Sequence, residues 1–288
     1  MVYNAREIKL WIKSAKNIAQ ITKAMEMVSA AKMKKAQARL GDSAPYAMKL
    51  HEMISTLASF IGSSNHPLLY VNPHPQNAMI VLMTSNRGLC GALNGNIFRE
   101  SYKLAQSLTQ RGLHVAYTAI GRKGRDFLKY TRRNIVGIFD GFGDTPRYRD
   151  IQPISHFIID AFLSHSYDEI YFVYPQFVST LTQHAVVHRL LPVLLPDSSF
   201  SQATTQKPIF EPGSDELLHH LLPYYVEQEL FHFILQSNAS EHSARMIAMK
   251  NAHDNATEVR KELTLAFNSA RQAQITQQIA EIASATMV

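Results

Sequence analysis

The residues with the clearest chemical potential form a glycine-bearing turn at positions 85–95, directly after an apolar run. The turn reads Ser-Asn-Arg-Gly-Leu-Cys-Gly-Ala-Leu-Asn-Gly, with glycines at Gly88, Gly91 and Gly95. A turn of this kind between a strand and a helix can bind phosphate through its backbone N–H groups. Its GxxGxxxG spacing, however, is neither the dinucleotide-binding GxGxxG nor the Walker GxxxxGK[ST]. The turn therefore disfavours nucleotide binding and leaves a nucleotide-using α/β enzyme as a minor alternative.

Three other sets of side chains could do chemistry. Cys90 has no neighbouring base to activate it, so a small buried thiol is expected. Asp140 and Asp144 could share a metal, but the glycines between them are more typical of a turn. His184 and His188 lack the glutamate of an HExxH site and are expected in or next to a strand. The sequence thus predicts no catalytic residue, no metal site and no cofactor.

Composition excludes several classes of protein. Of the 288 residues, 46% are apolar and 18% are charged, as in globular rather than disordered chains. No run approaches about 18 apolar residues, so no membrane-spanning helix is expected. The first 19 residues lack the apolar core of a signal peptide. A single cysteine excludes a disulfide-built scaffold and fits a reducing compartment.

Glycine and proline are unevenly distributed along the chain. All 12 glycines and all 12 prolines lie between Gly41 and Pro223, and residues 1–40 and 224–288 contain neither. Because both residues interrupt helices, a long continuous helix is predicted at each end of the chain.

Both terminal segments carry apolar or small residues at alternating spacings of three and four, the pattern of a left-handed coiled coil. The C-terminal stripe consists of Met249, Ala252, Ala256, Val259, Leu263, Ala266, Ala270, Ala273, Gln277, Ala280 and Ser284. The N-terminal stripe consists of Ile8, Trp11, Ala15, Ile18, Thr22 and Met25. The simplest arrangement pairs the two helices antiparallel, and the alternative is two long helices that fold back separately on a core.

Between residues 77 and 195, strand-like and helix-like segments alternate. Strands are predicted at Ala78–Thr84, His114–Ile120, Glu169–Tyr174 and Val186–Leu195, the last at a sheet edge because it contains Pro192. Helices are predicted at Leu93–Arg111, Arg122–Tyr130 and Tyr148–Leu163. This alternation is typical of a mainly parallel sheet.

Together these patterns predict an α/β protein with a long antiparallel coiled coil of N- and C-terminal helices and an inserted Rossmann-like α/β domain. The expected parts are an N-terminal coiled-coil helix at 1–65, the α/β domain at 77–206, and a C-terminal coiled-coil helix at 210–288 that pairs with the first.

Charge is concentrated in the first predicted helix. Residues 1–40 hold nine basic and two acidic residues, whereas residues 224–288 hold five basic and seven acidic residues. A helix with a net charge of +7 suits an acidic protein surface or nucleic acid, or it is simply a solvated basic face. A basic coiled-coil nucleic-acid-binding protein therefore remains an alternative, although no exposed aromatic residues are expected between the cations.

Four motifs in order along the chain resemble the gamma subunit family of F-type ATP synthase. They are Ile-Thr-Lys-Ala-Met-Glu-Met-Val at 21–28, Asn-Arg-Gly-Leu-Cys-Gly at 86–91, Ala-Arg-Met-Ile-Ala-Met-Lys-Asn-Ala at 244–252 and Ala-Arg-Gln-Ala-Gln-Ile-Thr at 270–276. The resemblance covers essentially the whole chain. It departs from the family pattern near the C-terminus, at Gln278, Ala285 and Thr286.

The resemblance implies a rotor without catalytic residues of its own, in a proton-transporting two-sector ATPase. Its implied partners are three alpha and three beta subunits, an epsilon subunit and the membrane ring of c subunits, and no nucleic acid. Rotation of the c ring would be coupled to ATP synthesis or hydrolysis at the alpha/beta sites, and ATPase activity would be regulated. The implied location is peripheral, on the cytoplasmic face of the inner (plasma) membrane.

The resemblance also assigns contact residues. Those implied to meet the alpha and beta subunits are Lys9, Lys23, Met25, Arg245, Arg271, Gln272 and Thr276. Those implied to lie at the foot, toward the c ring, are Lys34, Lys35, Arg39, Phe210 and Glu211.

Overall fold

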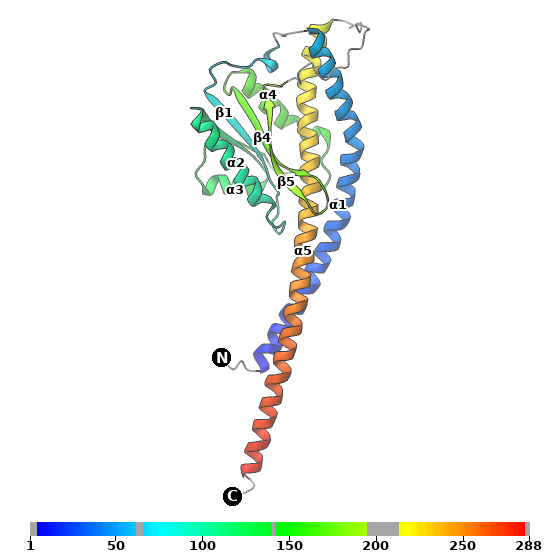
Figure 1. The fold of residues 1–288 in the computed structure, drawn as a ribbon, viewed down its shortest axis with the longest axis vertical. Coiled ribbons are helices and arrows are strands. Elements are labelled where there is room, and N and C mark those ends of the chain that lie inside the picture. The colour runs from blue at the N-terminus through cyan, green and yellow to red at the C-terminus, as the bar shows by residue number, and fades with distance from the viewer. Residues whose placement is uncertain (1–4, 62–65, 140–141, 195–212, 286–288) are drawn as a thin grey trace. The chain divides into compact units, whose positions relative to one another are not determined.

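The computed structural model describes residues 5–61, 66–139, 142–194 and 213–285. Two long helices begin and end the described chain, α1 (Ala5–Ile61) and α5 (Ser214–Ala285) (Figure 1). Contacts divide the chain into two units. Unit 1 comprises Met1–Ala30 and Arg245–Val288, and unit 2 comprises Ala31–Ala244.

Both helices extend through residues that usually interrupt helices. α1 continues past Gly41 and Pro45, and α5 begins before Pro223. Pro45 is exposed, whereas Leu50 and Ile54 beyond it are buried in a core of unit 2. Tertiary packing therefore supports helix on the far side of the proline, since burial of an apolar face outweighs local propensity.

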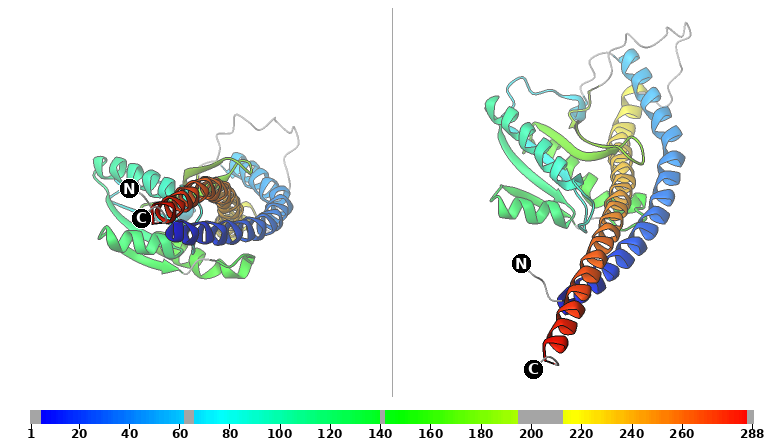
Figure 2. Two further views of the ribbon diagram at one scale, coloured as in Figure 1. Left: turned by 90° about the horizontal axis from the view of Figure 1, so that it is seen from below. Right: turned by 60° about the horizontal axis from the view of Figure 1, so that its bottom comes forward.

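In unit 1, α1 and α5 lie side by side and antiparallel, as predicted (Figure 2). Nδ1 of His253 on α5 lies 2.8 Å from the carbonyl oxygen of Ala19 on α1, which fixes the register. The buried side chains of α1 are small or slender here: Ile8, Ala15, Ala19, Thr22 and Ser29. They follow a heptad spacing, so this pair is a coiled coil with a narrow seam.

The predicted seam of α1 was wrong at two positions. Trp11 and Ile18 are 43% and 49% exposed, and the seam passes through Ala19 instead. The contact between Nδ1 of His253 and the carbonyl oxygen of Ala19 shows that α5 packs over Ala19 and not over Ile18.

The seam of α5 was predicted correctly only in part. Met249 is buried and Ala252, Ala256, Leu263 and Ala270 are half-buried. Val259 and Ala266 are exposed, as are all side chains described from Arg271 onward. The register places the first described residue of α1, Ala5, near the level of Phe267. Beyond that level, α5 has no neighbouring helix within the described part of the chain (Figure 1).

Unit 2 contains a five-stranded sheet in the order β3-β2-β1-β4-β5. The strands are β1 (Asn77–Met83), β2 (His114–Ile120), β3 (Ile135–Phe139), β4 (Glu169–Phe177) and β5 (Gln183–Leu191). β1 to β4 are parallel, and β5 is antiparallel to β4 at one edge. The mainly parallel sheet and the edge position of the last strand are confirmed.

The helices of the α/β domain are α2 (Leu93–Gln110), α3 (Arg122–Tyr130) and α4 (Gln152–Leu163), with short 3-10 turns η1 (Pro67–Leu69) and η2 (Tyr148–Asp150). Two expectations need correction here. β3 was not predicted, and the helix expected at Tyr148–Leu163 is two elements. Pro153 lies in the first turn of α4, where the ring is tolerated, so the helix starts anew there.

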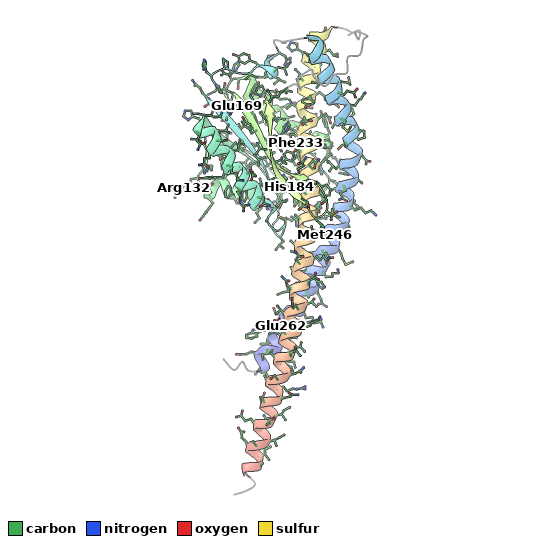
Figure 3. The ribbon with its side chains drawn as sticks, in the orientation of Figure 1. Arg132, Glu169, His184, Phe233, Met246 and Glu262 are labelled. Carbon is green, nitrogen blue, oxygen red and sulfur yellow. The ribbon has the colours of Figure 1, made fainter. Side chains whose placement is uncertain are left out.

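The sheet has a hydrophobic core on each face. Alternate residues of the central strand β1 point to opposite sides, so Met79, Val81 and Met83 pack toward α4 and α5, and Ala78, Ile80 and Leu82 pack toward α2 and α3. Figure 3 labels Phe233, where α5 meets the sheet. Its ring stacks on that of Tyr174 at a centroid distance of 4.4 Å. The α5 segment of unit 2 is thus part of the domain core.

Candidate functional site

The helix pair of unit 1 carries the seven residues assigned to alpha and beta contacts. Lys9 and Lys23 are exposed on α1, and Met25 is half-buried. Arg245 on α5 is only 8% exposed. The antiparallel register brings Lys23, Met25 and Arg245 to a similar level along the pair. Lys9 lies about 21 Å from Lys23 along α1 at 1.5 Å per residue.

The other three residues of this set are on the part of α5 that extends beyond α1. Arg271, Gln272 and Thr276 are exposed, and the Thr276 hydroxyl donates to the carbonyl oxygen of Gln272 at 3.0 Å. At 1.5 Å per residue, Arg271 is about 39 Å from Arg245. The structure therefore separates the seven residues into a middle group of Lys23, Met25 and Arg245 and a tip group of Arg271, Gln272 and Thr276, with Lys9 between the two levels, and it does not form one compact site from them.

An apolar stripe accompanies the tip group. Ile275, Ile279 and Ile282 are 47%, 62% and 68% exposed. Their spacings of four and three place them on one helix face. Clustered apolar side chains in contact with solvent are typical of a surface that binds another protein.

The basic surface of α1 is partly neutralised at Lys23. Its Nζ donates to both carboxylate oxygens of Glu26, at 3.0 and 3.1 Å. The Lys23 side chain is 49% exposed and that of Glu26 is 17% exposed, and an ion pair at a protein surface contributes about 0–1 kcal/mol to stability. Sequence reasoning counted this charge but did not identify the pair, although the i,i+3 spacing of Lys23 and Glu26 was a visible signal.

The residues assigned to the foot are only partly described. Lys34, Lys35 and Arg39 are exposed on the segment of α1 in unit 2. Phe210 and Glu211 lie outside the described residues, so their assignment remains a prediction from the sequence.

The glycine-bearing turn after β1 is filled by its own side chains. Nδ2 of Asn94 donates to Oγ of Ser85 at 2.8 Å and to Sγ of Cys90 at 3.3 Å, and Ser85 Oγ donates to the carbonyl oxygen of Arg87 at 2.8 Å. The predicted buried thiol is confirmed, because Cys90 is 3% exposed. The polar groups of this turn thus support its own conformation.

The second element of the turn region is the start of α3. The Thr84 hydroxyl, at the end of β1, accepts a hydrogen bond from the backbone N–H of Gly124 at 2.8 Å. Gly121 has a φ of +93°, and a Cβ there would lie 2.2 Å from the carbonyl oxygen of Thr84. Glycine is therefore required at this position, for backbone conformation and for space.

The two aspartates of the predicted metal-or-turn segment have different outcomes. Asp140 lies outside the described residues. Asp144 binds Lys32 on α1, with Nζ and Oδ2 2.6 Å apart, and its Oδ1 lies 3.5 Å from Nε2 of His242 on α5. Sequence reasoning missed these contacts, because nothing in the local sequence indicates partners so far along the chain.

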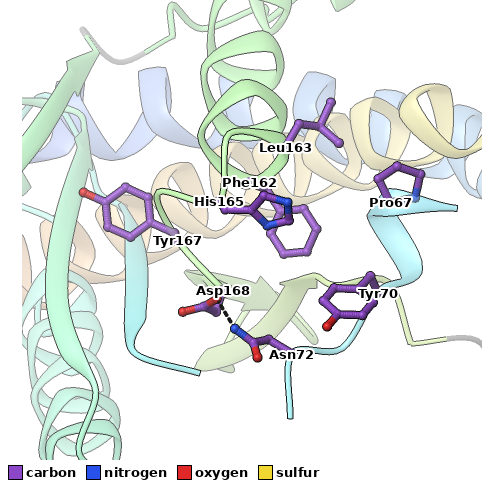
Figure 4. Close-up of a pocket in the computed structure, with 8 residues that line it drawn as sticks. All are labelled: Pro67, Tyr70, Asn72, Phe162, Leu163, His165, Tyr167 and Asp168. Carbon is purple, nitrogen blue, oxygen red and sulfur yellow. Dashed lines mark hydrogen bonds between the residues drawn. The ribbon is translucent and has the colours of Figure 1, made fainter. Parts of the chain in front are cut away.

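A shallow hollow lies at the amino ends of β1 and β4 (Figure 4). It is lined by Pro67, Tyr70, Asn72, Phe162, Leu163, His165, Tyr167 and Asp168. The Asp168 carboxylate accepts hydrogen bonds from Nδ2 of Asn72 at 2.7 Å and from the N–H groups of Gln76 and Asn77 at 2.8 and 2.9 Å. These bonds lower the pKa of Asp168, although its burial alone would raise it. The carboxylate therefore has a structural role at the start of β1.

Neither a metal centre nor a membrane-spanning helix is found in the described ranges. Among these residues, no three His, Cys, Asp or Glu side chains gather as metal ligands would. None of the helices described has the length and apolar character needed to cross a membrane.

Comparisons with known proteins agree across the chain. The family model described as ATP synthase matches residues 4–287. The ATP synthase gamma chain of Roseiflexus sp. (strain RS-1) is 43% identical over 282 residues, which cover 98% of this chain and 97% of that protein.

Solved structures show the same fold. The central stalk and c-ring structure of the Tetrahymena thermophila mitochondrial ATP synthase contains a chain similar at a TM-score of 0.60 and 25% identity, over 81% of this chain and 99% of that one. A chain in the rotor of the Euglena gracilis mitochondrial ATP synthase is similar in fold at a TM-score of 0.63 and 17% identity, over 93% of this chain and 99% of that one. The chain therefore belongs to the ATP synthase gamma chain family and is the non-catalytic, central-stalk rotor subunit of an F-type ATP synthase.

Proposed function

We propose that unit 1 turns inside a ring of three alpha and three beta subunits, and that unit 2 meets the epsilon subunit and the membrane ring of c subunits. The observation that carries this proposal is the unaccompanied tip of α5. Its surface carries an exposed apolar stripe at Ile275, Ile279 and Ile282, and such a stripe is typical of a surface that binds another protein. A surrounding ring of subunits supplies one.

The tip of α5 is better suited to rotate against its partners than to bind them at one fixed angle. Its apolar contacts are non-directional, so they bury surface at every angle of rotation. Arg271, Gln272 and Thr276 on the same segment can form polar contacts with the alpha and beta subunits at particular angles. Alternation between the two kinds of contact suits a shaft that pauses and then moves.

The middle group suits acidic loops of the beta subunits. Lys23 offers a cation in this group and Lys9 offers another farther along α1 toward the tip, and the weak pair between Lys23 and Glu26 can open when a stronger partner arrives. Attraction between exposed charges is screened within about 10 Å at ordinary ionic strength, so it biases the angle without locking it. Met25 and Arg245 lie near the same level and would limit how closely a loop approaches.

The exposed cations Lys34, Lys35 and Arg39 are assigned to the foot, with Phe210 and Glu211. In this arrangement, proton flow turns the c ring, the chain turns with it, and its asymmetry changes the nucleotide affinity of each beta site in sequence. The chain would be peripheral, at the cytoplasmic face of the inner (plasma) membrane.

The test is ATP hydrolysis by co-purified alpha and beta subunits with and without this chain. The expected result is one copy of the chain for every three alpha/beta pairs and a sharp rise in turnover. A folded, helical chain that neither joins the complex nor changes turnover would contradict the proposed contacts. A control with Arg271 and Gln272 both changed to alanine separates assembly, which should persist, from turnover, which should fall.

A further inference from the structure

The loop after β3 contacts both long helices within unit 2. Asp144 in this loop binds Nζ of Lys32 on α1 at 2.6 Å, and its other oxygen lies 3.5 Å from Nε2 of His242 on α5. One turn earlier on α5, Nδ2 of Asn238 donates to the carbonyl oxygen of Gly143 at 3.2 Å. Two adjacent loop residues thus connect helices from opposite ends of the sequence.

The same loop is also joined to the sheet. Nδ2 of Asn86, just after β1, lies 3.5 Å from the carbonyl oxygen of Phe142. Oδ1 of Asn86 accepts a hydrogen bond from the backbone N–H of Arg122 at 3.2 Å, at the start of α3. Residues 142–144 of the loop are therefore held between the carboxyl ends of β1 and β2 on one side and the two helices on the other.

Electrostatics keep Asp144 charged. Its partial burial alone would raise its pKa, but Lys32, His242 and Arg87 together lower the pKa below the ordinary value. The His242 side chain is 4% exposed, so its ring is held in place, whereas Asp144 and Lys32 are 52% and 32% exposed. The Lys32–Asp144 contact is charge-assisted and therefore directional, and an ion pair this exposed contributes about 0–1 kcal/mol to stability.

The two residues that Asp144 contacts, Lys32 and His242, lie close to the boundaries between the two units. The chain passes between the two units only twice, at Ala30–Ala31 in α1 and at Ala244–Arg245 in α5. Lys32 and His242 lie beside these two crossing points. The covalent chain therefore connects the two units through α1 and through α5.

We propose that Asp144 is a positioning residue of the rotor, which binds Lys32 and His242 together so that the α/β domain turns α1 and α5 as one body. This inference rests on the rotor function. The described part of α1 joins the apolar core of unit 2 through Leu50 and Ile54, which lie about five turns or more beyond Lys32. Beside the crossing points, the Asp144 contacts supply a directional link between α1 and α5.

The experiment measures torsional stiffness in the assembled complex. A probe is attached at Tyr130→Cys, a position on α3 that is 88% exposed, while the native Cys90 is buried and does not react. Thermal angular fluctuations of the probe are recorded in complexes stalled without ATP. Asp144→Asn should widen the variance of the angle by roughly twofold, because a charge-assisted contact is lost.

Asp126→Asn is the matched control. Asp126 is 59% exposed and pairs with Arg125, its neighbour on the same helix, so its loss should leave the variance unchanged. A variance for Asp144→Asn equal to that of the control and of the unmodified chain would overturn the proposal.

A charge exchange gives a second, independent test. Lys32→Asp and Asp144→Lys should each widen the distribution of the probe angle. The two changes together should narrow that distribution again, because they restore an ion pair of reversed polarity. An angular distribution as wide in the double variant as in the single variants would overturn the proposal, even if Asp144→Asn failed to assemble. ATP-driven rotation of the probe with the unmodified chain checks the rotor function separately, because loss of that rotation would contradict the function and not the role of Asp144.

Discussion

The carboxylate of Glu229 on α5 lies 3.9 Å from Nε2 of His188 on β5. Glu229 is largely buried between α5 and the sheet, and this burial raises its pKa to about 7. Burial also lowers the pKa of His188. Both groups therefore favour their neutral forms, and the contact between α5 and the edge strand depends on protons near neutral pH.

The stability of unit 2 should reflect this. Between the ordinary pKa of 4.5 and the raised value near 7, the folded chain holds a proton on Glu229 that the unfolded chain has lost. The contribution of Glu229 to the free energy of unfolding therefore falls as pH rises through this window, by on the order of 3 kcal/mol. Glu229→Gln should remove the fall, so its stability relative to the unmodified chain should increase from pH 4.5 to 7.

Denaturant unfolding of the isolated chain at several pH values measures this difference. Glu216→Gln, a change at an exposed carboxylate on the same helix, is the control and should show a flat difference. Comparing variants is necessary because the lowered pKa values of Asp144, Asp168 and Glu169 act in the opposite direction, below the ordinary carboxylate range. If the difference in free energy of unfolding between Glu229→Gln and the unmodified chain did not change with pH, the raised pKa of Glu229 would be contradicted.

Gly121→Ala should destabilise the chain severely. The added Cβ would lie 2.2 Å from the carbonyl oxygen of Thr84, and the φ of +93° is unfavourable for any L side chain. We expect a loss of at least about 3 kcal/mol, from backbone strain together with the displaced β1–α3 connection. Thermal unfolding of the isolated chain measures the loss, and a melting temperature within a few degrees of the unmodified chain would show that the turn relaxes.

Gly41→Ala should have the opposite effect. Gly41 is inside α1 and exposed, and a Cβ there meets nothing within 4 Å. Alanine should therefore stabilise the helix by roughly 0.5–1 kcal/mol, because glycine loses more backbone entropy. The measurement is the same denaturant unfolding. A destabilised Gly41→Ala chain would indicate that α1 is not a regular helix at this residue.

The central part of the sheet could be predicted from sequence because burial on both faces produces continuous apolar runs. β1, β2 and β4 begin within one residue of their predicted starts. β3 could not be predicted, because Gly137 interrupts its run. That glycine is explained only by the fold, since a Cβ there would lie 3.1 Å from the ring of Phe157 on α4.

The helix pair shows the same limit. Alternating spacing predicted a coiled coil, but hydrophobicity alone selected Trp11 and Ile18, whereas close packing selects Ala19. Lys9, Arg271 and Gln272 are exposed, and their contacts with partner subunits stay predictions from the sequence. The contacts of Asp144 needed coordinates, because its partners Lys32 and His242 come from the first and last helices.

Arg271→Ala gives the sharpest test of the tip. Arg271 is exposed beyond the level where α1 begins, so its loss should change the stability of the isolated chain by no more than about 0.5 kcal/mol. If Arg271 forms a charge-assisted hydrogen bond to the alpha or beta subunits, its loss should slow ATP hydrolysis by the complex roughly tenfold. Lys261 is an exposed cation on the part of α5 that lies beside α1. Lys261→Ala should change neither the stability of the isolated chain nor the rate of ATP hydrolysis by the complex. Equal turnover for both variants would place the angle-dependent contacts elsewhere on the shaft and leave the apolar stripe as the main feature of the tip.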